Sequence, residues 1–557
     1  MDQKFLKISN LFNEKKYDEL IFFIQSSFQD KSAQILNILG VSRLFNSRDP
    51  KSLILAISDF KQGYLKEKKT QFGLEALINF INTAVDLYTL QSPAEDFKHD
   101  SSIYLNQTNF FYDEAKIHFG YNQKLVSAMV KVYKNQGDIT KTLHHYKMLF
   151  DNNNLNLSMF SSWIFFNNYK DEWAQKDYLK YSKLFEKYIE KIPENKLIKI
   201  NEIKNDKIKI GFLSSDILKK HSITYFLKTI LKNYDKDKFE IYLYLDNNIE
   251  DENTNEFKIL VEKTFNISNL NNPQVLNLIR KDKIDVMFDI AGLTSIERIS
   301  LFKNRLAAKQ ISWLGYCNTT GLKNMDYLIA DKNLIYPDEE DGYSEKIIYL
   351  SNIWNCHSGL DFNIVETEAP CLKEKNITFA SFNNFNKIND NVINVWSKIL
   401  QNVKNSKLIL KSSLKTDSNF LKTKFADKGV LNSVTFLEKR KLDIHFNLYK
   451  QVDIALDTFP YNGVTTSFEA ISMGVPVITM KGFNFNSRCG ASINMNLGME
   501  NLIAKDEEDY IFKAKELAED KEKLSNIRKK IFKNSCDTPL FDTKKFSKDF
   551  FKILENI

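Results

Sequence analysis

The sequence predicts an α/β protein in which two doubly wound domains follow an all-helical region. Apolar residues recur at helical spacing up to about residue 190. From residue 205, short β-branched and aromatic runs alternate with helical stretches, in two series divided near residues 355 to 372. Buried strands separated by helices are typical of parallel sheets covered by helices on both faces. Two such series predict two domains facing one another across a cleft, with ligands bound at the carboxyl ends of the strands.

Size and composition narrow the class of protein. The chain has 557 residues, and at about 150 residues per domain this length suggests three or four folding units. Its net charge of +7 is small beside 78 basic and 71 acidic residues, and no basic stripe with interleaved aromatics occurs, so we expect no nucleic-acid partner. No apolar stretch of about 18 residues predicts insertion into a membrane.

The cysteines favour a reducing compartment. All five lie past residue 300, are widely spaced and form no CxxC or Cys/His ligand pattern. A disulfide framework or a structural zinc site is therefore not expected. Because the N-terminus also lacks a signal-type apolar region, we expect a soluble cytoplasmic protein.

The helical region shows a repeating pattern. Two amphipathic helices with a polar turn between them are predicted in residues 5–28, and the pattern returns in 33–60 and, with an NQGD turn, in 125–150. Small residues stand where helices must approach, at Ala33, Gly40 and Ala128. Helix pairs at a period of 34 to 40 residues resemble degenerate tetratricopeptide repeats, whose groove binds peptides or proteins. The alternative is an ordinary helical domain.

Each series of apolar runs supplies the strands of one predicted sheet. The first series comprises residues 207–214, 239–246, 284–292, 309–316 and 325–331, and the second comprises 376–383, 406–413, 433–438, 452–459 and 476–480.

One stretch, DTFPYNGVTTSFEAISMGVPVITMKG at residues 457–482, joins a strand to a helix through a glycine turn. Thr466 and Glu469 have the spacing of a capping box, in which both side chains satisfy amides at the helix N-terminus. The same free amides present a partial positive charge to a phosphate. The hydroxyls of Thr465 and Thr466 could add donors and Glu469 could accept from a ribose. Glu469 cannot serve the cap and the ribose equally well.

Three further residues lie near predicted strand ends. Lys387 follows the run at 376–383, where a lysine could neutralise a departing diphosphate. His221 follows the first strand of the first sheet, and His445 lies in the helix before the strand at 452. A surface lysine and two histidines placed by chance are the alternative interpretation.

Several long segments, in one order along the chain, resemble the protein O-GlcNAc transferase family, which includes the plant SPINDLY proteins. The segments are KIKIGFLSSDILKKHS (207–222), DIAGLTSIERISLFKNRLAAKQISWLGYCNTTGLKNMDYLIAD (289–331), YSEKIIYL (343–350), FNNFNKIND (382–390), DIALDTFPYNGVTTSFEAISMGVPVITM (453–480) and NSRCGASINMNLGMENLIA (486–504). The match covers about residues 205 to 550. The helical half is similar to the repeats that precede the catalytic region of that family, and SSWIFFNNYKDEWAQKDYLKYSKLFEKY (161–188) resembles its helical connector.

The resemblance implies a glycosyltransferase of the GT-B type, with a pair of Rossmann-like lobes after a tetratricopeptide-like domain. The domains would be a helical repeat domain with connector (1–190), an N-terminal catalytic lobe (205–355) and a C-terminal nucleotide-sugar lobe with C-terminal helices (372–557). The implied enzyme is inverting, needs no metal or other cofactor, and moves GlcNAc or another hexose from a nucleotide sugar, expected to be a UDP-sugar, to Ser or Thr of acceptor proteins.

Site residues follow from the resemblance by position. His221 matches a histidine beside the reaction centre, and Lys387 matches the lysine that stabilises the leaving diphosphate. The donor site would further include Gly315 of the LGY segment, Asn384 where the family has Gln, Lys441 as the nearest candidate for a second lysine, His445, Thr465, Thr466 and Glu469.

The sequence departs from the family at several positions. Leu293 and Cys317 stand where bacterial relatives have His and Pro, Val464 replaces the first residue of His-Thr-Thr, Lys441 is one position off, and one extra residue precedes His221. These departures leave two alternatives open: a non-catalytic scaffold with a vestigial nucleotide cleft, and a related glycosyltransferase that uses Asn or a non-protein acceptor.

Overall fold

The computed structural model describes residues 3–90, 101–198, 206–218, 221–294, 296–360, 366, 368–374, 376–411, 418–437 and 442–557. The chain forms two compact units, Met1–Leu155 with Lys415–Leu421 and Asn156–Leu414 with Lys422–Ile557. Lys441 lies outside the described residues. Within the described residues, no helix is both long enough and apolar enough to cross a bilayer.

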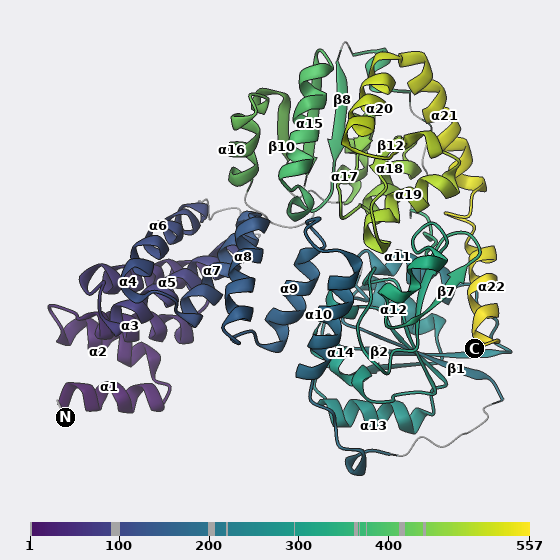
Figure 1. The fold of residues 1–557 in the computed structure, drawn as a ribbon. Coiled ribbons are helices and arrows are strands. Elements are labelled where there is room, and N and C mark those ends of the chain that lie inside the picture. The colour runs from purple at the N-terminus through teal and green to yellow at the C-terminus, as the bar shows by residue number, and fades with distance from the viewer. Residues whose placement is uncertain are drawn as a thin grey trace. The chain divides into compact units, whose positions relative to one another are not determined.

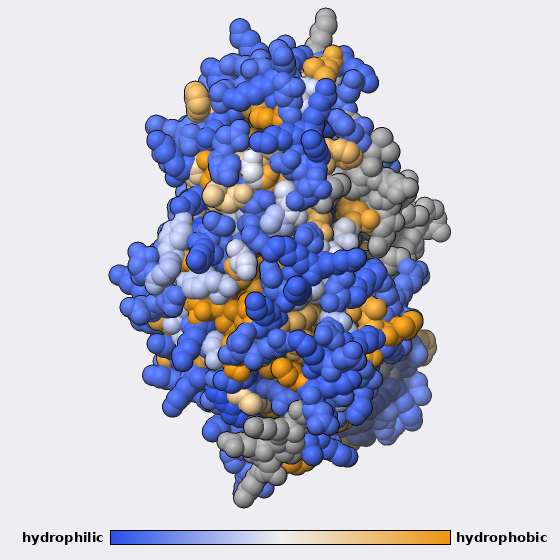
Figure 2. Space-filling view, turned by 90° about the vertical axis from the view of Figure 1, so that its right-hand side faces the viewer, coloured by the Kyte–Doolittle hydropathy of each residue, from blue (hydrophilic) through white to orange (hydrophobic). Residues whose placement is uncertain are grey.

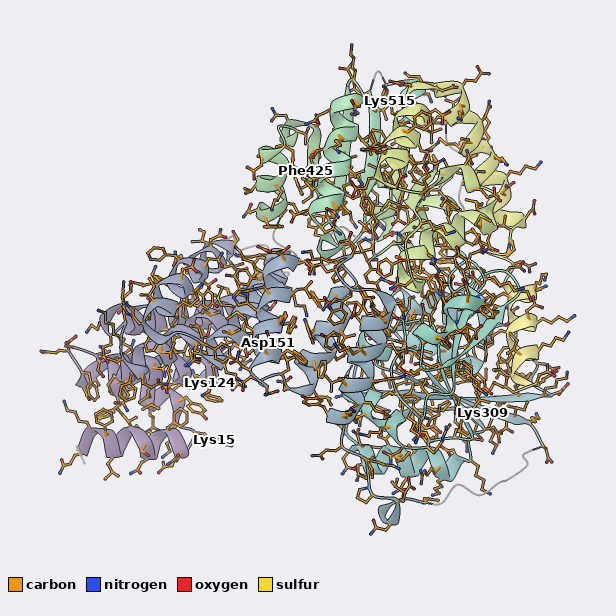
Figure 3. The ribbon with its side chains drawn as sticks, in the orientation of Figure 1. Lys15, Lys124, Asp151, Lys309, Phe425 and Lys515 are labelled. Carbon is orange, nitrogen blue, oxygen red and sulfur yellow. The ribbon has the colours of Figure 1, made fainter. Side chains whose placement is uncertain are left out.

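The first unit is helical, as predicted. Its helices are α1 (Gln3–Asn13), α2 (Tyr17–Ser27), α3 (Ala33–Asn46), α4 (Pro50–Lys66), α5 (Gln71–Thr89), α6 (Ser102–Phe119), α7 (Gln123–Gln136) and α8 (Ile139–Asp151). The predicted helix boundaries hold where the sequence carries cap residues. In the NQGD turn Gly137 adopts φ +77° and ends α7, and the side chain of Asp138 caps α8. Lys15, labelled in Figure 3, lies in the turn between α1 and α2 with φ +58°.

Small residues permit close helix packing in this unit. Ala33 and Ala128 are buried, and a Cβ added at Gly40 would lie 2.5 Å from the ring of Phe60. The sequence-based expectation for all three positions is confirmed.

The second unit begins with two connector helices, α9 (Leu157–Asn167) and α10 (Gln175–Tyr188), and then forms two sheets. The first lobe contains seven parallel strands in the order β3-β2-β1-β4-β5-β6-β7. They are β1 (Ile208–Ser214), β2 (Phe239–Leu245), β3 (Lys263–Asn266), β4 (Val286–Asp289), β5 (Lys309–Ser312), β6 (Tyr327–Asp331) and β7 (Lys346–Leu350). Its helices are α11 (Ile223–Leu231), α12 (Glu252–Leu260), α13 (Asn272–Asp282) and the short α14 (Ile296–Ile299).

The second lobe repeats this topology with six parallel strands, β10-β9-β8-β11-β12-β13. They are β8 (Ile377–Ser381), β9 (Ser406–Lys411), β10 (Val434–Leu437), β11 (Ile454–Leu456), β12 (Val477–Met480) and β13 (Ile503–Ala504). The helices are α15 (Asp390–Asn402), α16 (Asn419–Asp427), α17 (Leu442–Tyr449), α18 (Thr465–Ser472), α19 (Phe485–Leu497), α20 (Glu507–Glu519) and α21 (Lys521–Asp537). The predicted fold class, with two Rossmann-like lobes after a helical region, is confirmed.

The last helix, α22 (Thr543–Leu554), packs on the first lobe rather than on the second (Figure 1). Its Phe550 lies 4.7 Å from the ring of Trp313 and stacks on Phe288, which in turn stacks on Phe212 of β1. These four rings form the aromatic centre of the first lobe. The core of the first lobe is therefore completed by a helix that follows the second lobe in the sequence.

Side-chain placement follows the expected division between core and surface. On the face shown in Figure 2, hydrophilic side chains predominate and hydrophobic ones form small, separated patches. Phe425 of α16, labelled in Figure 3, is fully buried and contacts Phe436 of β10 edge to face. Burying such a ring stabilises the lobe by about 1.5–3 kcal/mol relative to leaving it exposed.

Candidate functional site

Each sheet reverses its strand order between two neighbouring strands, β1 and β4 in the first lobe and β8 and β11 in the second. Loops that leave the carboxyl ends of such strands diverge and leave a crevice, where ligands of doubly wound sheets bind. In the second lobe these loops carry Lys387 after β8 and residues 457–464 after β11. In the first lobe they carry His221 after β1 and Asp289 at the end of β4.

Lys387 is held by the loop that follows β11. Its Nζ donates to the carbonyl O of Asn462 at 2.7 Å and lies 4.2 Å from the centroid of the Tyr461 ring. Burial lowers the pKa of Lys387, and the negative charge of Asp457 opposes this change. A cation at this point of the crevice can stabilise a departing anion.

Helix α18 begins differently from the capping-box prediction, which is wrong. The N-cap residue is Val464, which has no side-chain hydrogen bond to the helix amides. The hydroxyl of Thr466 donates instead to Oδ1 of Asn383 at 2.9 Å. The backbone amides of Thr465 and Thr466 donate no hydrogen bond to any of the described residues. The helix therefore presents two unpaired amides at the crevice, where an anion would be stabilised.

Glu469 is turned away from the start of α18. Its Oε2 lies 3.0 Å from Nε2 of His445 and accepts a hydrogen bond of 3.1 Å from the hydroxyl of Tyr449. All three side chains are buried, and Nδ1 of His445 has no partner among the described residues. Glu469 therefore does not cap the N-terminus of α18. Its carboxylate instead joins α18 to α17.

His221 lies at the end of the loop that follows β1. Its imidazole is 46% exposed, and Nε2 lies 4.0 Å from Oδ2 of Asp216. Its backbone carbonyl accepts from the hydroxyl of Thr224 at 2.7 Å, which anchors it at the start of α11. An accessible imidazole beside a carboxylate is suited to accept a proton.

The LGY segment after β5 makes a strained, close turn. Leu314 adopts φ +78°, a conformation that costs a non-glycine residue about 1–3 kcal/mol. A Cβ added at Gly315 would lie 2.2 Å from the carbonyl O of Ile290, so only glycine lets the turn reach the loop after β4. This turn fixes the position of Cys317, which is one of the groups near Lys387.

The remaining sequence-predicted positions fall around this crevice or beside it. The side chain of Asn384 accepts from the amide of Asn386 at 3.1 Å and its carbonyl accepts from the amide of Lys387 at 2.9 Å, so it shapes the turn that carries the lysine. Leu293 is buried, and its carbonyl accepts from Ser161 of α9. Hydrogen bonds tie Lys387 to Asn462 and Thr466 to Asn383 within the second lobe. Among the described residues, no hydrogen bond joins His221 to this group.

Sequence reasoning missed several residues of the crevice. Tyr461 lies within the quoted turn, but only the structure shows its ring against Lys387 and its contacts with Phe165 and Tyr169 of the connector. Phe165 also contacts Tyr316 of the first lobe, so the connector touches both lobes here. No local pattern signals contacts between residues about 300 positions apart.

Asp289 was also missed. Its Oδ1 accepts from the amides of Ala291 and Gly292, while Oδ2 has no partner among the described residues. Burial raises the pKa of Asp289 to about 6. Its place directly after an apolar strand run was the available signal.

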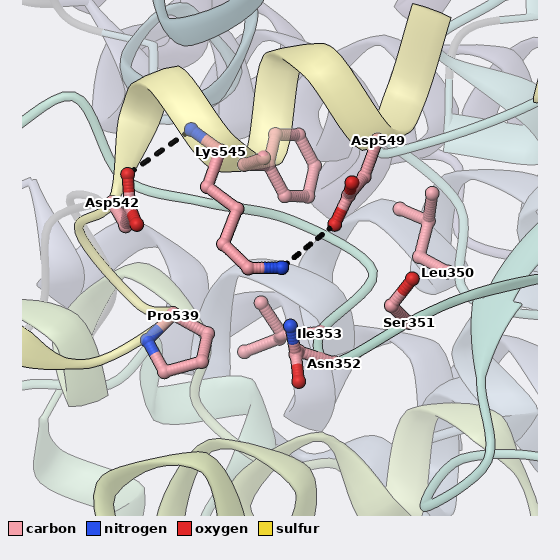
Figure 4. A pocket seen from close by; sticks show the side chains of 9 residues that line it. Leu350, Ser351, Asn352, Ile353, Pro539, Asp542, Lys545 and Asp549 are labelled. Atoms are coloured by element: carbon pink, nitrogen blue, oxygen red, sulfur yellow. Dashed lines mark hydrogen bonds and ion pairs between the residues drawn. The ribbon is translucent and has the colours of Figure 1, made fainter. Parts of the chain in front are cut away.

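A separate pocket lies where α22 meets the first lobe (Figure 4). Its lining includes Asn352, Ile353 and Lys545, whose Nζ donates to Asp549 at 3.2 Å. None of the sequence-predicted site residues lines this pocket, and the crevice between the strand ends remains the candidate site.

Comparison with known proteins gives one family. Residues 182–359 and 360–550 match glycosyl transferase family 41. The probable UDP-N-acetylglucosamine–peptide N-acetylglucosaminyltransferase SPINDLY of Solanum lycopersicum is 31% identical over 404 residues, which cover 69% of this chain and 41% of that protein. The corresponding protein of Eustoma exaltatum subsp. russellianum is 33% identical over 353 residues, covering 61% and 38%. The chain thus matches about two fifths of the length of these plant relatives.

A solved structure has the same fold over nearly the whole chain. The Thermobaculum terrenum O-GlcNAc transferase, as a lysine-to-methionine mutant, superposes with a TM-score of 0.76 and covers 94% of this chain and 98% of its own. Sequence identity is 20%, so this likeness concerns the fold.

Proposed function

Because the chain belongs to glycosyl transferase family 41, we propose that it transfers a sugar from a nucleotide-sugar donor to Ser or Thr hydroxyls of acceptor proteins. The donor is a UDP-sugar carrying GlcNAc or another hexose, and transfer inverts the anomeric carbon without a metal ion. One observation carries this proposal: Lys387 and the two unpaired amides of α18 lie on the two loops that border the strand-order reversal of the second sheet.

These groups have the charge that the leaving group needs. In the reaction, the acceptor oxygen forms a bond to the anomeric carbon while the bond to the diphosphate oxygen breaks, and negative charge develops on the diphosphate. Lys387 and the amides of Thr465 and Thr466 are positioned before the reaction to stabilise that charge, which is the largest single contribution in many enzymes. The proton of the acceptor hydroxyl passes to His221, whose imidazole is accessible and lies near Asp216.

The donor's ribose contacts the pair formed by His445 and Glu469. Oε2 of Glu469 is engaged by His445 and Tyr449, and no described residue donates to Oε1. This second oxygen is free to accept from ribose hydroxyls. Gly315 and its neighbours border the sugar from the first lobe.

The helical unit binds the acceptor protein in this proposal. Large apolar side chains on its surface remain exposed, including Phe22 at 74%, Phe110 at 67% and Ile117 at 81%. In this proposal the acceptor polypeptide covers these side chains. A reducing, cytoplasmic setting completes the proposal and is supported by the free thiols of Cys317, Cys356, Cys371 and Cys489.

The test is a transfer assay with UDP- and GDP-sugars and a mixture of candidate acceptor proteins, read by mass spectrometry of Ser and Thr residues. We expect transfer from one donor, retained in EDTA and lowered about 100- to 1,000-fold by Lys387→Met. Lys398→Met, at an exposed position of α15, is the matched control and should transfer normally.

Two outcomes would overturn the proposal. Binding of a nucleotide without transfer from any sugar would favour a non-catalytic scaffold. Transfer to Asn or to a non-protein acceptor would keep the enzyme class and change the substrate.

A further inference from the structure

Two aspartates flank β11, one at each end of the strand. Asp453 precedes the strand, and its carboxylate accepts from the amides of Cys371 and Thr378. Asp457 follows it and lies at the crevice end. Burial raises the pKa of both carboxyls, that of Asp457 to about 6. The two residues are chemically alike, but only Asp457 faces the candidate site.

Asp457 supports the loop that carries the partner of Lys387. Its Oδ1 accepts from the amides of Thr458 at 2.9 Å and Gly463 at 2.6 Å, which are the two ends of that loop. Its Oδ2 accepts from the hydroxyl of Thr479 at 2.8 Å. Nδ2 of Asn383 also donates to Oδ1, at 3.5 Å. A buried carboxylate with these donors fixes both its own orientation and the span of the loop.

The loop also closes against α19. The amide of Gly490 donates to the side-chain oxygen of Asn462 at 3.1 Å, and a Cβ at Gly490 would lie 2.6 Å from Oδ2 of Asp457. Asn462 in turn offers its carbonyl oxygen to Lys387. Asp457 therefore supports the loop whose Asn462 carbonyl orients Lys387.

We propose that Asp457 is a positioning residue for Lys387: it holds the 458–463 loop in place and supplies the negative charge that keeps the ammonium protonated before a donor binds. This inference rests on the proposed function in one respect, which is that Lys387 serves the donor diphosphate. The carboxylate itself does not touch the donor.

The other groups near Lys387 do not supply a negative charge. The lysine is faced by Asp457, by the thiols of Cys489 and Cys317, and by the ring of Tyr461. Burial raises the pKa of Cys489 and of Tyr461 well above their ordinary values, so both are neutral at pH 7. The hydroxyl of Tyr510 donates to the backbone carbonyl of Asp457. Burial raises the pKa of Tyr510 in the same way. Asp457 is the acidic side chain among these groups.

The substitution Asp457→Asn separates charge from shape. An amide of the same size can accept from Thr458 and Gly463 through its oxygen, so the loop keeps its main contacts. Its charge is lost, and the proton of Lys387 should then be released at lower pH, by about one pH unit. Asp453→Asn removes the same charge from the other end of β11 and is the matched control.

The experiment measures the pH dependence of acetylation at Lys387 in the full chain, read by mass spectrometry, together with UDP affinity between pH 6 and 10. We expect the labelling midpoint of Asp457→Asn to lie about one pH unit below that of the wild type and of Asp453→Asn. UDP affinity should fall at correspondingly lower pH in Asp457→Asn, while at pH 6 it should equal or exceed that of the wild type. Lys387→Met should lack this alkaline loss of affinity.

The outcomes separate the inference from the proposed function. An unchanged labelling midpoint, or UDP affinity lowered equally at every pH, would overturn the role of Asp457 and indicate a structural contact only. A shifted midpoint without UDP binding would support Asp457 as the partner of Lys387 and count against the proposed function. Where Asp457→Asn does not fold, Asp457→Ser removes the same charge, and its labelling midpoint tests the effect of charge without the control for shape.

Discussion

Nε2 of His445 lies 3.0 Å from Oε2 of Glu469, and the two residues join α17 to α18. This contact decides between two roles that the sequence allows for Glu469. A carboxylate that caps its own helix stabilises the protein, whereas one held by His445 and Tyr449 keeps its second oxygen for a ligand.

We therefore expect Glu469→Gln to weaken UDP binding about 10- to 100-fold, because a hydrogen bond to a charged group is worth about 1.5–3 kcal/mol. Pyrophosphate, which has no ribose, should bind the variant as it binds the wild type. Titration calorimetry with both ligands measures the difference, and Glu500→Gln, at an exposed position, is the control. Equal losses for UDP and pyrophosphate would contradict a ribose contact.

The second prediction concerns the close turn at Gly315. In Gly315→Ala the added Cβ would lie 2.2 Å from the carbonyl O of Ile290, so the turn or the loop after β4 must shift. Such overpacking costs about 1–3 kcal/mol and should move Cys317 away from Lys387. We expect lower thermal stability together with loss of transfer.

Gly429→Ala is the control for this variant. Gly429 has a positive φ, +73°, and a Cβ there meets no atom within 4 Å. Its stability should fall by about 1 kcal/mol from backbone strain alone, with transfer unchanged. Full transfer by Gly315→Ala would show that the LGY turn tolerates displacement.

These positions show what the sequence could and could not predict. Strands with long apolar runs, such as β1 and β2, were predicted almost to the residue. A buried strand consists largely of apolar residues, so its bounds can be seen in the sequence. β3 was missed because it is a short edge strand, Lys-Thr-Phe-Asn, with no fully buried residue. The helix boundary at the NQGD turn was predicted, and Gly137 and Asp138 mark it.

The capping box failed for a different reason. The spacing of Thr466 and Glu469 is a local signal, but both side chains have stronger partners that come from elsewhere in the chain. Asn383 lies 83 positions before Thr466, and His445 lies 24 positions before Glu469. Residue types near strand ends predicted the neighbourhood of the site; the pairings required the folded chain.

The contact between Arg488 and Glu339 makes a third prediction, about the junction of the two lobes. Both guanidinium Nη atoms donate to the Glu339 carboxylate, at 2.5 and 2.7 Å, and the Arg488 side chain is 6% exposed. Arg488→Met removes the cationic partner of the Glu339 carboxylate, which is 32% exposed and keeps only the hydrogen bond from the amide of Tyr336 among the contacts described. We expect a loss of about 2–4 kcal/mol, measured by urea unfolding of the second unit within the full chain.

The control for this pair lies on the surface of α20. Lys515, labelled in Figure 3, is 3.8 Å from Glu519, and both side chains are about half exposed. Lys515→Met should change stability by less than about 0.5 kcal/mol, because solvent screens such pairs. A double variant, Arg488→Met with Glu339→Gln, should recover part of the loss; no recovery would assign the effect to packing of the arginine stem.

The fourth prediction concerns pH and the helical unit. Nε2 of His145 lies 3.0 Å from the hydroxyl of Tyr112, its ring also contacts Tyr133, and burial lowers its pKa to about 4. An unfolded histidine has a pKa of about 6.5, so between these values the unfolded chain binds a proton that the folded unit does not. Stability therefore falls as pH drops from 6.5 to 4, by up to about 3 kcal/mol.

Hydrogen exchange of peptides from α6 and α8 in the full chain measures this loss locally. Protection should decrease between pH 7 and 5 in the wild type, after correction for the intrinsic exchange rate. His145→Gln should reduce this pH dependence, since glutamine does not titrate, although its protection at pH 7 should be lower because the contact with Tyr112 changes. His118→Gln alters an exposed histidine of α6 and should keep the wild-type pH dependence. If His145→Gln and the wild type lose protection in parallel, other groups in the unit carry the titration and the buried imidazole does not.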